Sequence, residues 1–313
     1  MPSVDNIGFA ARCRIPLSHS SSRVPRAIIA LALLSLIWGY NWVVMKLAGN
    51  YAGPFDFAAL RTVFGALALF AVLRWRRQPM RVVAPGWTLL LGLLQTAGFT
   101  GLSQWALVSG GAGKTAVLAY TMPFWILLLA WPLLGERLRG WQWLAVATAF
   151  VGLMLIVEPW NSQGSLASEM LAVASGLAWG ASAIVAKKMR MRHQVDLLSL
   201  TAWQMLFGAI ALVIVAMMVP SPPLIVGGYL IWAVVYTSIL GTALAWLLWL
   251  YVLDTLPAGV AGVGTLAIPA VGVLAAWMQI GERPNAAELS GMLAIALGLA
   301  LLAAASQRQE RGN

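Results

Sequence analysis

Apolar runs of roughly 20 residues follow one another along most of the chain, and short segments between them carry most of the charges. A run of this length is what an α-helix needs to cross the hydrocarbon core of a bilayer. The pattern predicts an all-α integral membrane protein with ten transmembrane helices, and the short connections predict that sequential helices are antiparallel. The predicted helices lie near residues 26–48, 54–73, 87–108, 114–134, 141–158, 167–187, 197–219, 228–253, 257–280 and 286–305.

The amino-acid composition excludes a soluble fold. Of the 313 residues, 61% are hydrophobic and 10% are charged, whereas a soluble domain is about 45–50% apolar and about 25% charged. The predicted helices leave no room for a soluble enzymatic or nucleic-acid-binding domain. The expected partners are therefore the lipid bilayer and a small-molecule substrate. Nucleic acid is excluded in spite of the net charge of +10, and the oligomeric state stays open.

The basic residues are distributed unevenly between the two sides of the predicted bundle. If the N terminus is cytoplasmic, 16 of the 20 Lys and Arg residues fall on the cytoplasmic side, where 1–25 and 306–313 form the tails. Cytoplasmic loops of membrane proteins carry such an excess. The distribution predicts that both termini are cytoplasmic, which requires an even number of helices. The remaining basic residues, on the outer side or within a helix, are Lys46, Arg61, Lys114 and Arg283.

The two halves of the chain repeat each other. Residues 112–156 align without gaps on residues 258–302, and thirteen of the 45 positions are identical. An apolar composition would match Leu and Ala by chance, but not the rarer residue types that coincide in one register. These rarer matches are Pro123 with Pro269, Trp131 with Trp277, and Glu136 with Glu282.

Shorter matches extend the repeat toward the beginning of each half. They pair Trp38 with Trp179 and Lys46 with Lys187 at an offset of 141, and Arg61 with Gln204 at an offset of 143. Each copy would contain five helices. Because five is odd, the second copy enters the membrane from the opposite side, and such inverted repeats are common in secondary transporters. The predicted copies span residues 26–158 and 167–305.

Several fragments resemble the EamA family of the drug/metabolite transporter superfamily. They are WGYNWVVMK at 38–46, FAALRTVFGALAL at 57–69, and the two blocks that run from a proline to a Gly-Glu-Arg sequence. The resemblance covers about residues 26–305. It implies ten helices in two inverted EamA repeats around a central substrate cavity, as in exporters of amino acids or related metabolites in bacterial inner membranes.

The predicted function is secondary transport by alternating access, with export of amino acids, in particular aromatic or apolar ones, across the bacterial inner membrane. Efflux of drug-like or nucleotide-type molecules is the alternative. A membrane enzyme that acts on lipids would need a catalytic pair near one interface, and the sequence offers none. A scaffold protein would have no reason to keep inverted repeats. The direction of transport stays open.

Two prolines occupy matching places in the two repeats, deep in the predicted helices. Pro123 and Pro269 each disrupt the hydrogen bond to the carbonyl four residues earlier, at Ala119 and Thr265. A loosened carbonyl is tolerated in a membrane where protein or a water-filled cavity satisfies it. The two prolines therefore indicate the binding site or a pair of hinges. The alternative is a packing kink in each helix.

Arg61 lies well inside the second predicted helix. A cation at this depth is costly and usually faces the bundle interior or an aqueous path. The guanidinium could hold the carboxylate of an amino acid or organic acid through two hydrogen bonds. The alternatives are a side chain that reaches to the interface, or an ion pair with Asp56 or Glu282. The matching residue Gln204 is neutral, so the charge belongs to one repeat alone.

Aromatic and small polar residues cluster in the first helix of each repeat. Trp38 and Asn41 share a helix face because they are three residues apart, and an aromatic wall with one amide suits a small amphipathic ligand. The alternative is packing between helices. Tyr120 and Thr265 are further cavity candidates. The predicted substrate-binding residues are Trp38, Tyr40, Asn41, Arg61, Tyr120, Trp179, Ser182, Gln204 and Thr265.

Glu136 and Glu282 follow the C-terminal ends of the fourth and ninth predicted helices. A carboxylate is unfavourable there because the helix dipole is negative at that end. Each glutamate is therefore expected to pair with a cation or to cap a neighbouring helix, and a pair that forms a gate is the sharper alternative. With Pro123 and Pro269, they are the hinge or gate candidates.

The sequence predicts neither a metal site nor a cofactor. One cysteine, Cys13, and two distant histidines do not make a metal site. The segment 109–115 lacks the first glycine of a phosphate-binding loop and follows a predicted helix instead of a strand. All ten acidic residues fall in tails, loops or near helix ends. The hypothesis is therefore passive efflux, or coupling through a carboxylate at a helix end.

Overall fold

The computed structural model describes residues 23–135, 141–157, 165–256, 265 and 267–312, and all regular structure in these ranges is helical. The all-α prediction is confirmed. The elements are α1 (Arg23–Ala48), α2 (Pro54–Trp75), α3 (Pro85–Gly92), η1 (Leu93–Gly98), α4 (Phe99–Ser109), α5 (Ala112–Ala119), α6 (Met122–Leu134), α7 (Trp141–Val157), α8 (Leu166–Arg192), α9 (Leu197–Met218), α10 (Gly228–Val235), η2 (Tyr236–Leu244), α11 (Ala245–Thr255), α13 (Ala267–Ile280) and α14 (Ala286–Gly312).

The exposed sides of the bundle are apolar, as lipid contact requires. Met217 and Met278 are 83% and 85% exposed, and many other large apolar side chains also lie on the outside. Six helices in the described part of the chain have the length and composition to cross a membrane. They are Val24–Ala48, Pro54–Trp75, Ala112–Leu134, Leu166–Arg192, Leu197–Met218 and Gly228–Thr255.

Two stretches that the hydropathy pattern predicts as single helices contain a π-helical segment. In the first repeat η1 joins α3 to α4, and in the second η2 joins α10 to α11. A π-helical turn carries an extra residue, which rotates the following part of the helix and releases backbone groups, and such turns are frequent at functional sites. Both π segments also lie at corresponding places in the two repeats.

The spanning segment Ala112–Leu134 is interrupted just before Pro123, and most of the residues that precede Pro269 lie outside the described ranges. α5 ends at Ala119 and α6 begins at Met122, which makes Pro123 the second residue of a new helix. Pro269 is the third residue of α13. Proline is tolerated in the first turn of a helix because its missing N–H would have no partner there. The carbonyl of Thr265 accepts a hydrogen bond from the amide of Ile268 at 3.1 Å.

The first helix of the second repeat is longer than predicted. α8 continues past residue 187 to Arg192, and Lys187 and Arg190 lie within it. The predicted helix, 167–187, stops five residues earlier. Both residues therefore lie on the last turns of α8.

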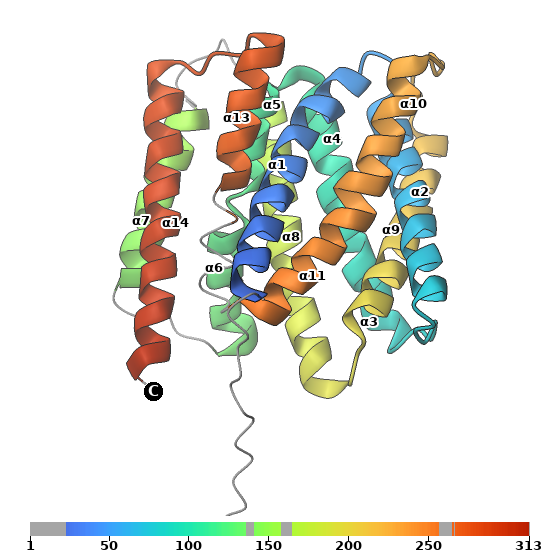
Figure 1. The fold of residues 1–313 in the computed structure, drawn as a ribbon. Helices are drawn as coiled ribbons and strands as arrows, with labels where there is room; N and C mark the ends of the chain where they lie inside the picture. The colour runs from blue at the N-terminus through green and yellow to red at the C-terminus, as the bar shows by residue number, and fades with distance from the viewer. Residues whose placement is uncertain (1–22, 136–140, 158–164, 257–264, 266, 313) are drawn as a thin grey trace, which may run out of the picture.

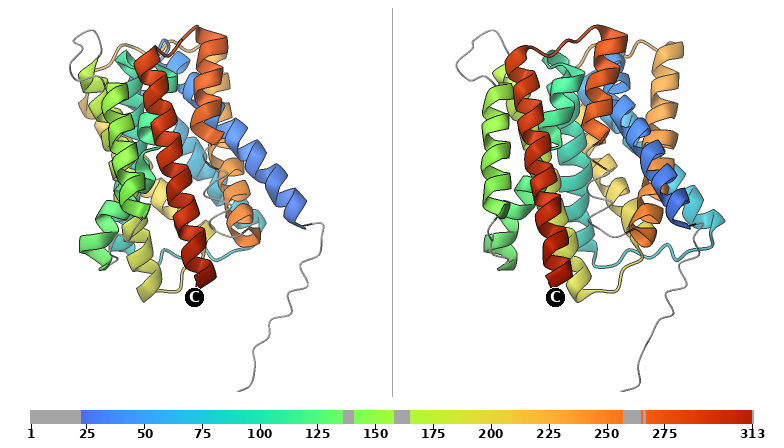
Figure 2. Two further views of the ribbon diagram at one scale, coloured as in Figure 1. Left: turned by 90° about the vertical axis from the view of Figure 1, so that its left-hand side faces the viewer. Right: turned by 60° about the vertical axis from the view of Figure 1, so that its left-hand side comes forward.

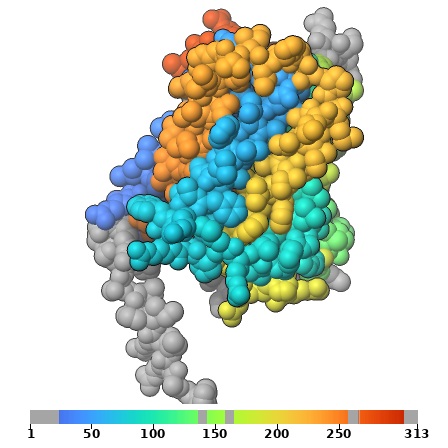
Figure 3. Space-filling model, turned by 90° about the vertical axis from the view of Figure 1, so that its right-hand side faces the viewer, coloured from blue at the N-terminus to red at the C-terminus, as the bar shows by residue number. Residues whose placement is uncertain are grey.

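The helices pack side by side with their ends at two faces of the bundle (Figure 1). The C terminus lies at the lower end of this view, together with the start of α1. The end of α1 and the start of α14 lie at the upper end. α7 and α14 form a pair at one side, which the rotated views in Figure 2 also show. At the opposite side α2 lies between α9 and the helix that contains α10 and η2 (Figure 3).

Contacts between helices recur at matching positions of the two repeats. α1 packs against α13 and α11, whereas α8 packs against α6 and α4. A Cβ on Gly39 would lie 2.5 Å from Val271, and one on Gly180 would lie 2.8 Å from Trp125. Gly39 and Gly180 are 141 positions apart, and Trp125 and Val271 are 146 apart, which is the spacing of the sequence repeat. The same close approach is therefore made twice.

A second pair of close approaches follows the same rule around the π segments. A Cβ on Gly65 of α2 would lie 2.8 Å from Thr242 of η2, and one on Gly208 of α9 would lie against Thr96 of η1. Gly65 and Gly208 are repeat partners at an offset of 143, and Thr96 and Thr242 at an offset of 146. Small residues let the helix backbones approach closely, which is how helices pack in membranes.

Candidate functional site

A cavity of about 890 Å³ lies between the two repeats. Its walls come from α1, α2, η1, α4 and α6 in the first half, and from α8, α9, η2, α11 and α13 in the second. The exposed residues Lys187, Arg190 and Met191 line it at the C-terminal end of α8. Asn41 and Met45, both buried, line it on α1 away from that end. The cavity therefore has its mouth at the lower end of the bundle in Figure 1.

A continuous set of aromatic rings forms one wall of the cavity. Phe99 meets Trp179 edge-on at 4.8 Å between ring centroids, and Trp179 stacks on Trp246 at 6.1 Å. Trp246 meets Trp38 edge-on at 6.1 Å, and Trp38 lies 6.4 Å from Trp249. These rings come from four helices of both halves. Such a wall suits an apolar or aromatic part of a ligand.

Both π segments contribute polar groups beside this wall. The indole Nε1 of Trp38 donates a hydrogen bond to the carbonyl oxygen of Gly241 in η2 at 2.9 Å. The hydroxyl of Thr96 in η1 donates to Oε1 of Gln204 at 2.8 Å. The released carbonyl of a π turn thus fixes the orientation of Trp38. The π turns were not predicted, yet they set the geometry of two predicted site residues.

The sulfur of Met45 accepts hydrogen bonds from two predicted site residues. Nδ2 of Asn41 donates to Sδ of Met45 at 3.0 Å, and Nη1 of Arg61 donates to the same atom at 2.8 Å. A thioether is a weak acceptor, particularly for a guanidinium. Met45 therefore orients both polar side chains without neutralising the charge of Arg61.

Three buried polar atoms that belong to cavity-lining residues have no hydrogen-bond partner among the residues that the structure describes. They are Oδ1 of Asn41, Nε of Arg61 and Nε2 of Gln204. Asn41 is 7% exposed and Gln204 is 1% exposed. A buried polar atom without a partner costs about 1–3 kcal/mol, and more when it is charged. One unpaired acceptor and two unpaired donors at one cavity indicate a ligand that carries the complementary groups.

Arg61 forms no ion pair within the described part of the chain. The carboxylate of Asp56 accepts a hydrogen bond from the hydroxyl of Ser221, and that of Glu282 accepts one from the amide of Gly113 at 3.2 Å. The structure therefore supports neither of the two ion pairs that the sequence left open. The positive charge of Arg61 faces the cavity instead.

Seven of the nine predicted substrate-binding residues line the cavity, and so does Pro123. Tyr40 and Ser182 do not. The ring of Tyr40 packs edge-on against Tyr236 at 5.7 Å between centroids, because position 40 lies on a different face of α1 from Trp38 and Asn41. Ser182 is fully buried, and its hydroxyl donates to the carbonyl of Trp179 in its own helix at 2.6 Å. The cavity therefore gives no support to these two as substrate-binding residues. The seven are Trp38, Asn41, Arg61, Tyr120, Trp179, Gln204 and Thr265.

The gate candidates lie apart from the cavity or outside the described residues. Pro269 is in the first turn of α13 and is not among the cavity-lining residues. Glu282 lies at the N-terminus of α5, where its hydrogen bond with Gly113 caps the helix. Glu136 falls outside the described residues. Glutamates at helix starts also hold Lys114, which lies 2.6 Å from Glu169 and 3.0 Å from Glu288.

Sequence reasoning missed Met45, Thr96 and Phe99 as site residues. Met45 reads as one more apolar residue, although it stands one helical turn after Asn41 and thus on the same face. Lys187 and Arg190 were counted only as a topology signal. The signal that could have found Lys187 is its repeat partner Lys46, since two lysines in matching places imply matching roles. In the described part of the chain, no group of three or more His, Cys, Asp or Glu residues could hold a metal.

Comparison with known protein families agrees with the repeat of the two halves. The model of the EamA-like transporter family matches the chain twice, over residues 25–158 and 166–304. The chain belongs to this family. It is a multi-pass membrane protein and a transporter, in a family of transporters and not of enzymes.

Curated relatives of this transporter carry transport names. An uncharacterized transporter of Bacillus subtilis, YoaV, is 26% identical over 88% of this chain and 95% of its own length. A probable amino-acid metabolite efflux pump of Escherichia coli is 25% identical over 87% and 92%. A riboflavin transporter of Rhizobium johnstonii is 31% identical over 56% and 55%. A solved structure with 20% sequence identity, described as a protein crystal structure, superimposes with a TM-score of 0.64 over 91% of this chain and 99% of its own, which shows the shared fold.

Proposed function

We propose that this protein is a secondary transporter that exports amino acids or closely related small metabolites by alternating access. The observation that carries the proposal is the combination of unpaired polar atoms with an aromatic wall in one cavity between the repeats. A transporter needs a site that holds the substrate near the middle of the bundle and releases it. The unpaired hydrogen-bonding groups in this cavity could hold the substrate.

The unpaired atoms match the polar groups of an amino acid. A carboxylate would accept hydrogen bonds from Nε of Arg61 and Nε2 of Gln204, which are repeat partners. Charge-assisted bonds of this kind are about twice as strong as neutral ones. The amide oxygen Oδ1 of Asn41 would accept a hydrogen bond from the ammonium group. The aromatic wall would cover an apolar or aromatic side chain.

Alternating access is supported by the way in which the halves repeat. Five predicted helices in each half would invert the second copy, and the same glycine contacts occur twice at the repeat spacing. An inverted repeat can exchange the conformations of its two halves, which moves the mouth of the cavity from one side to the other. With cytoplasmic termini, the described mouth faces the cytoplasm, where an exporter collects its substrate.

A larger planar metabolite is a second candidate substrate. The cavity of about 890 Å³ is at the upper end of the range for ligand pockets, and five aromatic rings cover one wall. One of the relatives is named a riboflavin transporter, and riboflavin contains a planar ring system. A planar acid would use the same donors on Arg61 and Gln204. Drug-like cations fit less well, because no carboxylate lines the cavity in the described part of the chain.

The proposed substrate class can be tested by counterflow in proteoliposomes. Vesicles are loaded with one unlabelled amino acid, and uptake of the same radiolabelled amino acid is followed for an aromatic, an aliphatic, an acidic and a basic representative. We expect saturable counterflow for the aromatic or aliphatic acids and none in protein-free vesicles. Counterflow of nucleotides or cationic dyes, with none for any amino acid, would contradict the proposal.

Energy coupling gives a separate prediction. No Asp, Glu or His lines the cavity among the described residues, so we expect no proton site on the substrate path. Counterflow should proceed without a pH gradient, and imposing a gradient of two units should change its initial rate less than about twofold. Radiolabel uptake with and without the gradient measures this. Uphill substrate accumulation driven by the pH gradient alone would contradict passive efflux.

A further inference from the structure

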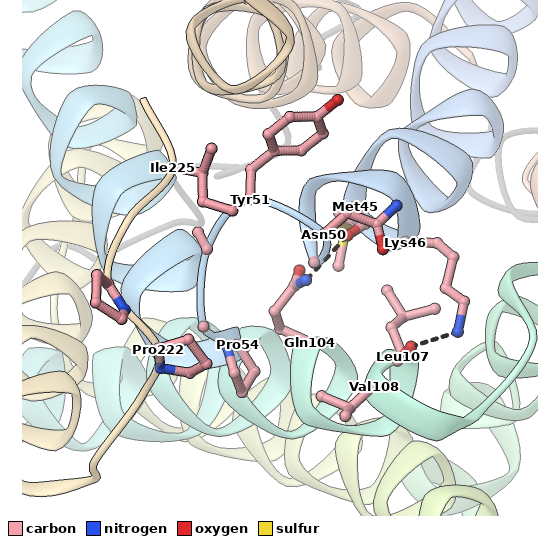
Figure 4. A pocket seen from close by; sticks show the side chains of 14 residues that line it. Met45, Lys46, Asn50, Tyr51, Pro54, Gln104, Leu107, Val108, Pro222 and Ile225 are labelled. Carbon is pink, nitrogen blue, oxygen red and sulfur yellow. Dashed lines mark hydrogen bonds between the residues drawn. The ribbon is translucent and has the colours of Figure 1, made fainter. Parts of the chain in front are cut away.

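A second hollow of about 280 Å³ lies at the end of the bundle opposite the cavity mouth. We call it the vestibule. The end of α1, the connection to α2, α4 and the residues Pro222, Pro223 and Ile225 line it. Figure 4 shows Gln104 of α4 pointing toward Met45 of α1, while Lys46 extends from α1 toward Leu107.

Met45 lines both the vestibule and the central cavity. Its side chain, 2% exposed, therefore forms part of the wall between them. The sulfur accepts hydrogen bonds from Asn41 and Arg61 on the cavity side. Its carbonyl oxygen accepts one from Nε2 of Gln104 at 3.0 Å, which Figure 4 shows as a dashed line.

The vestibule carries polar groups with unused bonding capacity. Oε1 of Gln104, a residue that is 2% exposed, has no hydrogen-bond partner in the described ranges of the chain. Nζ of Lys46 donates to the carbonyl oxygens of Leu107 and Gly110 at 2.8 and 2.9 Å. An ammonium group has three N–H donors, so one more remains for a ligand. A buried acceptor and a cation in the same hollow are complementary to a group that carries both an ammonium and a carboxylate.

The sequence repeat relates the vestibule to the cavity mouth. Lys46 and Lys187 are repeat partners at an offset of 141, and Lys187 lies at the mouth. At the same offset Met45 pairs with Ala186, which also lines the cavity. The small Ala186 thus lies at the open mouth of the cavity, and the large Met45 lies at the closed end, between the cavity and the vestibule.

We propose that the vestibule is a second binding site for a zwitterionic amino acid on the exit path, with Met45 as the plug between it and the central cavity. Lys46 would hold the carboxylate, and Oε1 of Gln104 would hold the ammonium group. The inference rests on the proposed function, because the exit site is meant for the same substrate as the cavity.

The plug is tested without any substrate, by labelling engineered cysteines with a membrane-impermeant maleimide. In a Cys13→Ser background, Ala183→Cys places the only thiol in the central cavity. Labelling rates are measured in sealed vesicles of both orientations. We expect labelling from one side only, and Met45→Ala to raise the rate from the other side at least tenfold. Met45→Leu keeps the bulk of the side chain and should leave that side closed.

Two results would contradict the proposal that Met45 is the plug. One is an unchanged labelling rate in Met45→Ala, and the other is an equal increase in Met45→Leu. The repeat partner gives an independent measurement, since Ala186→Met should slow labelling from the mouth side. An Ala186→Met rate equal to that of the parent would contradict the assigned correspondence.

The vestibule site is tested with L-phenylalanine as the probe. Val108→Cys, again in the Cys13→Ser background, places the thiol at the vestibule, where Val108 is exposed. We expect L-phenylalanine to protect this thiol. Lys46→Met should raise the concentration needed for half protection by about tenfold or more, as removing a charged hydrogen bond does. Lys46→Arg keeps the charge and should keep most of the protection.

The two thiols separate failure of this inference from failure of the proposed function. Protection at Ala183→Cys but not at Val108→Cys would overturn the vestibule site and leave the proposed function standing. Protection at neither thiol would contradict both the vestibule site and the proposed function. Protection at Val108→Cys that survives Lys46→Met unchanged would remove Lys46 from the site.

Discussion

Arg61→Ala is expected to abolish counterflow of carboxylate substrates while the protein stays folded in detergent. The guanidinium lies at the deep end of the cavity and has no carboxylate partner within the described part of the chain, so its charge is unused until a substrate arrives. Hydrogen bonds to charged groups contribute about 1.5–3 kcal/mol each. Loss of the charged bond from Nε to the carboxylate lowers substrate affinity by at least about tenfold, and the loss of the positive charge itself adds to this effect. Radiolabelled counterflow in proteoliposomes measures the effect.

Two further variants make the Arg61 prediction specific. Arg74→Ala removes an exposed arginine from the other end of the same helix, α2, and should transport like the wild type. Arg61→Lys keeps the charge but loses the planar donor geometry, so we expect an intermediate rate. Wild-type counterflow in Arg61→Ala would remove this residue from the substrate site.

Gly92→Val is expected to prevent stable packing of the two repeats. Gly92 in α3 faces α9, and a Cβ there would lie against the backbone carbonyl oxygen of Gln204. On the other helix, a Cβ on Gly208 would lie 2.6 Å from the carbonyl oxygen of Gly92. Because both contacts involve backbone atoms, a rotamer change cannot relieve the clash. We expect a loss of more than about 3 kcal/mol in the free energy of unfolding.

Thermal unfolding in detergent measures this loss against a control in the same helix. Gly86 also lies in α3, and a Cβ on it would meet nothing within 4 Å. Gly86→Ala should therefore leave the melting temperature within a few degrees of the wild type. A Gly92→Val protein that melts with the wild type would show that α3 and α9 do not pack as closely as described.

The sequence predicts the helices well because one strong physical requirement decides them. A spanning segment must be apolar over about 20 residues, and this pattern survives in the sequence of α9, predicted at 197–219 and found at Leu197–Met218. Hydropathy cannot detect η1 and η2, because a π turn changes the backbone hydrogen bonds without changing the residue types. It also cannot distinguish a kink at Pro123 from a break, since both need a proline.

The sequence predicts those site residues that are polar or charged within an otherwise apolar helix. Arg61 and Asn41 are polar in apolar helices, and Gln204 was found through its repeat partner. Helical geometry alone placed Trp38 and Asn41 on one face correctly. Ser182 stands 141 residues after Asn41, which makes it the repeat partner of Asn41, but it does not line the cavity and its hydroxyl is satisfied within its own helix.

Met45 shows why the rest of the site could not be predicted. It is an ordinary apolar residue in an apolar helix, and nothing in its type suggests that its sulfur orients two polar side chains. Its position between two hollows depends on contacts with residues far away in the sequence, such as Gln104. Such roles follow from tertiary packing, which local sequence patterns do not encode.

The central claim is that the cavity recognises a carboxylate beside an apolar or aromatic group, and one competition experiment tests it most directly. Counterflow of radiolabelled L-phenylalanine is measured with increasing 3-phenylpropionate, which keeps the carboxylate, or 2-phenylethylamine, which keeps the ammonium group. We predict that the acid inhibits at a concentration at least tenfold lower than the amine does, and that Arg61→Gln removes this difference. Stronger inhibition by the amine would contradict the account.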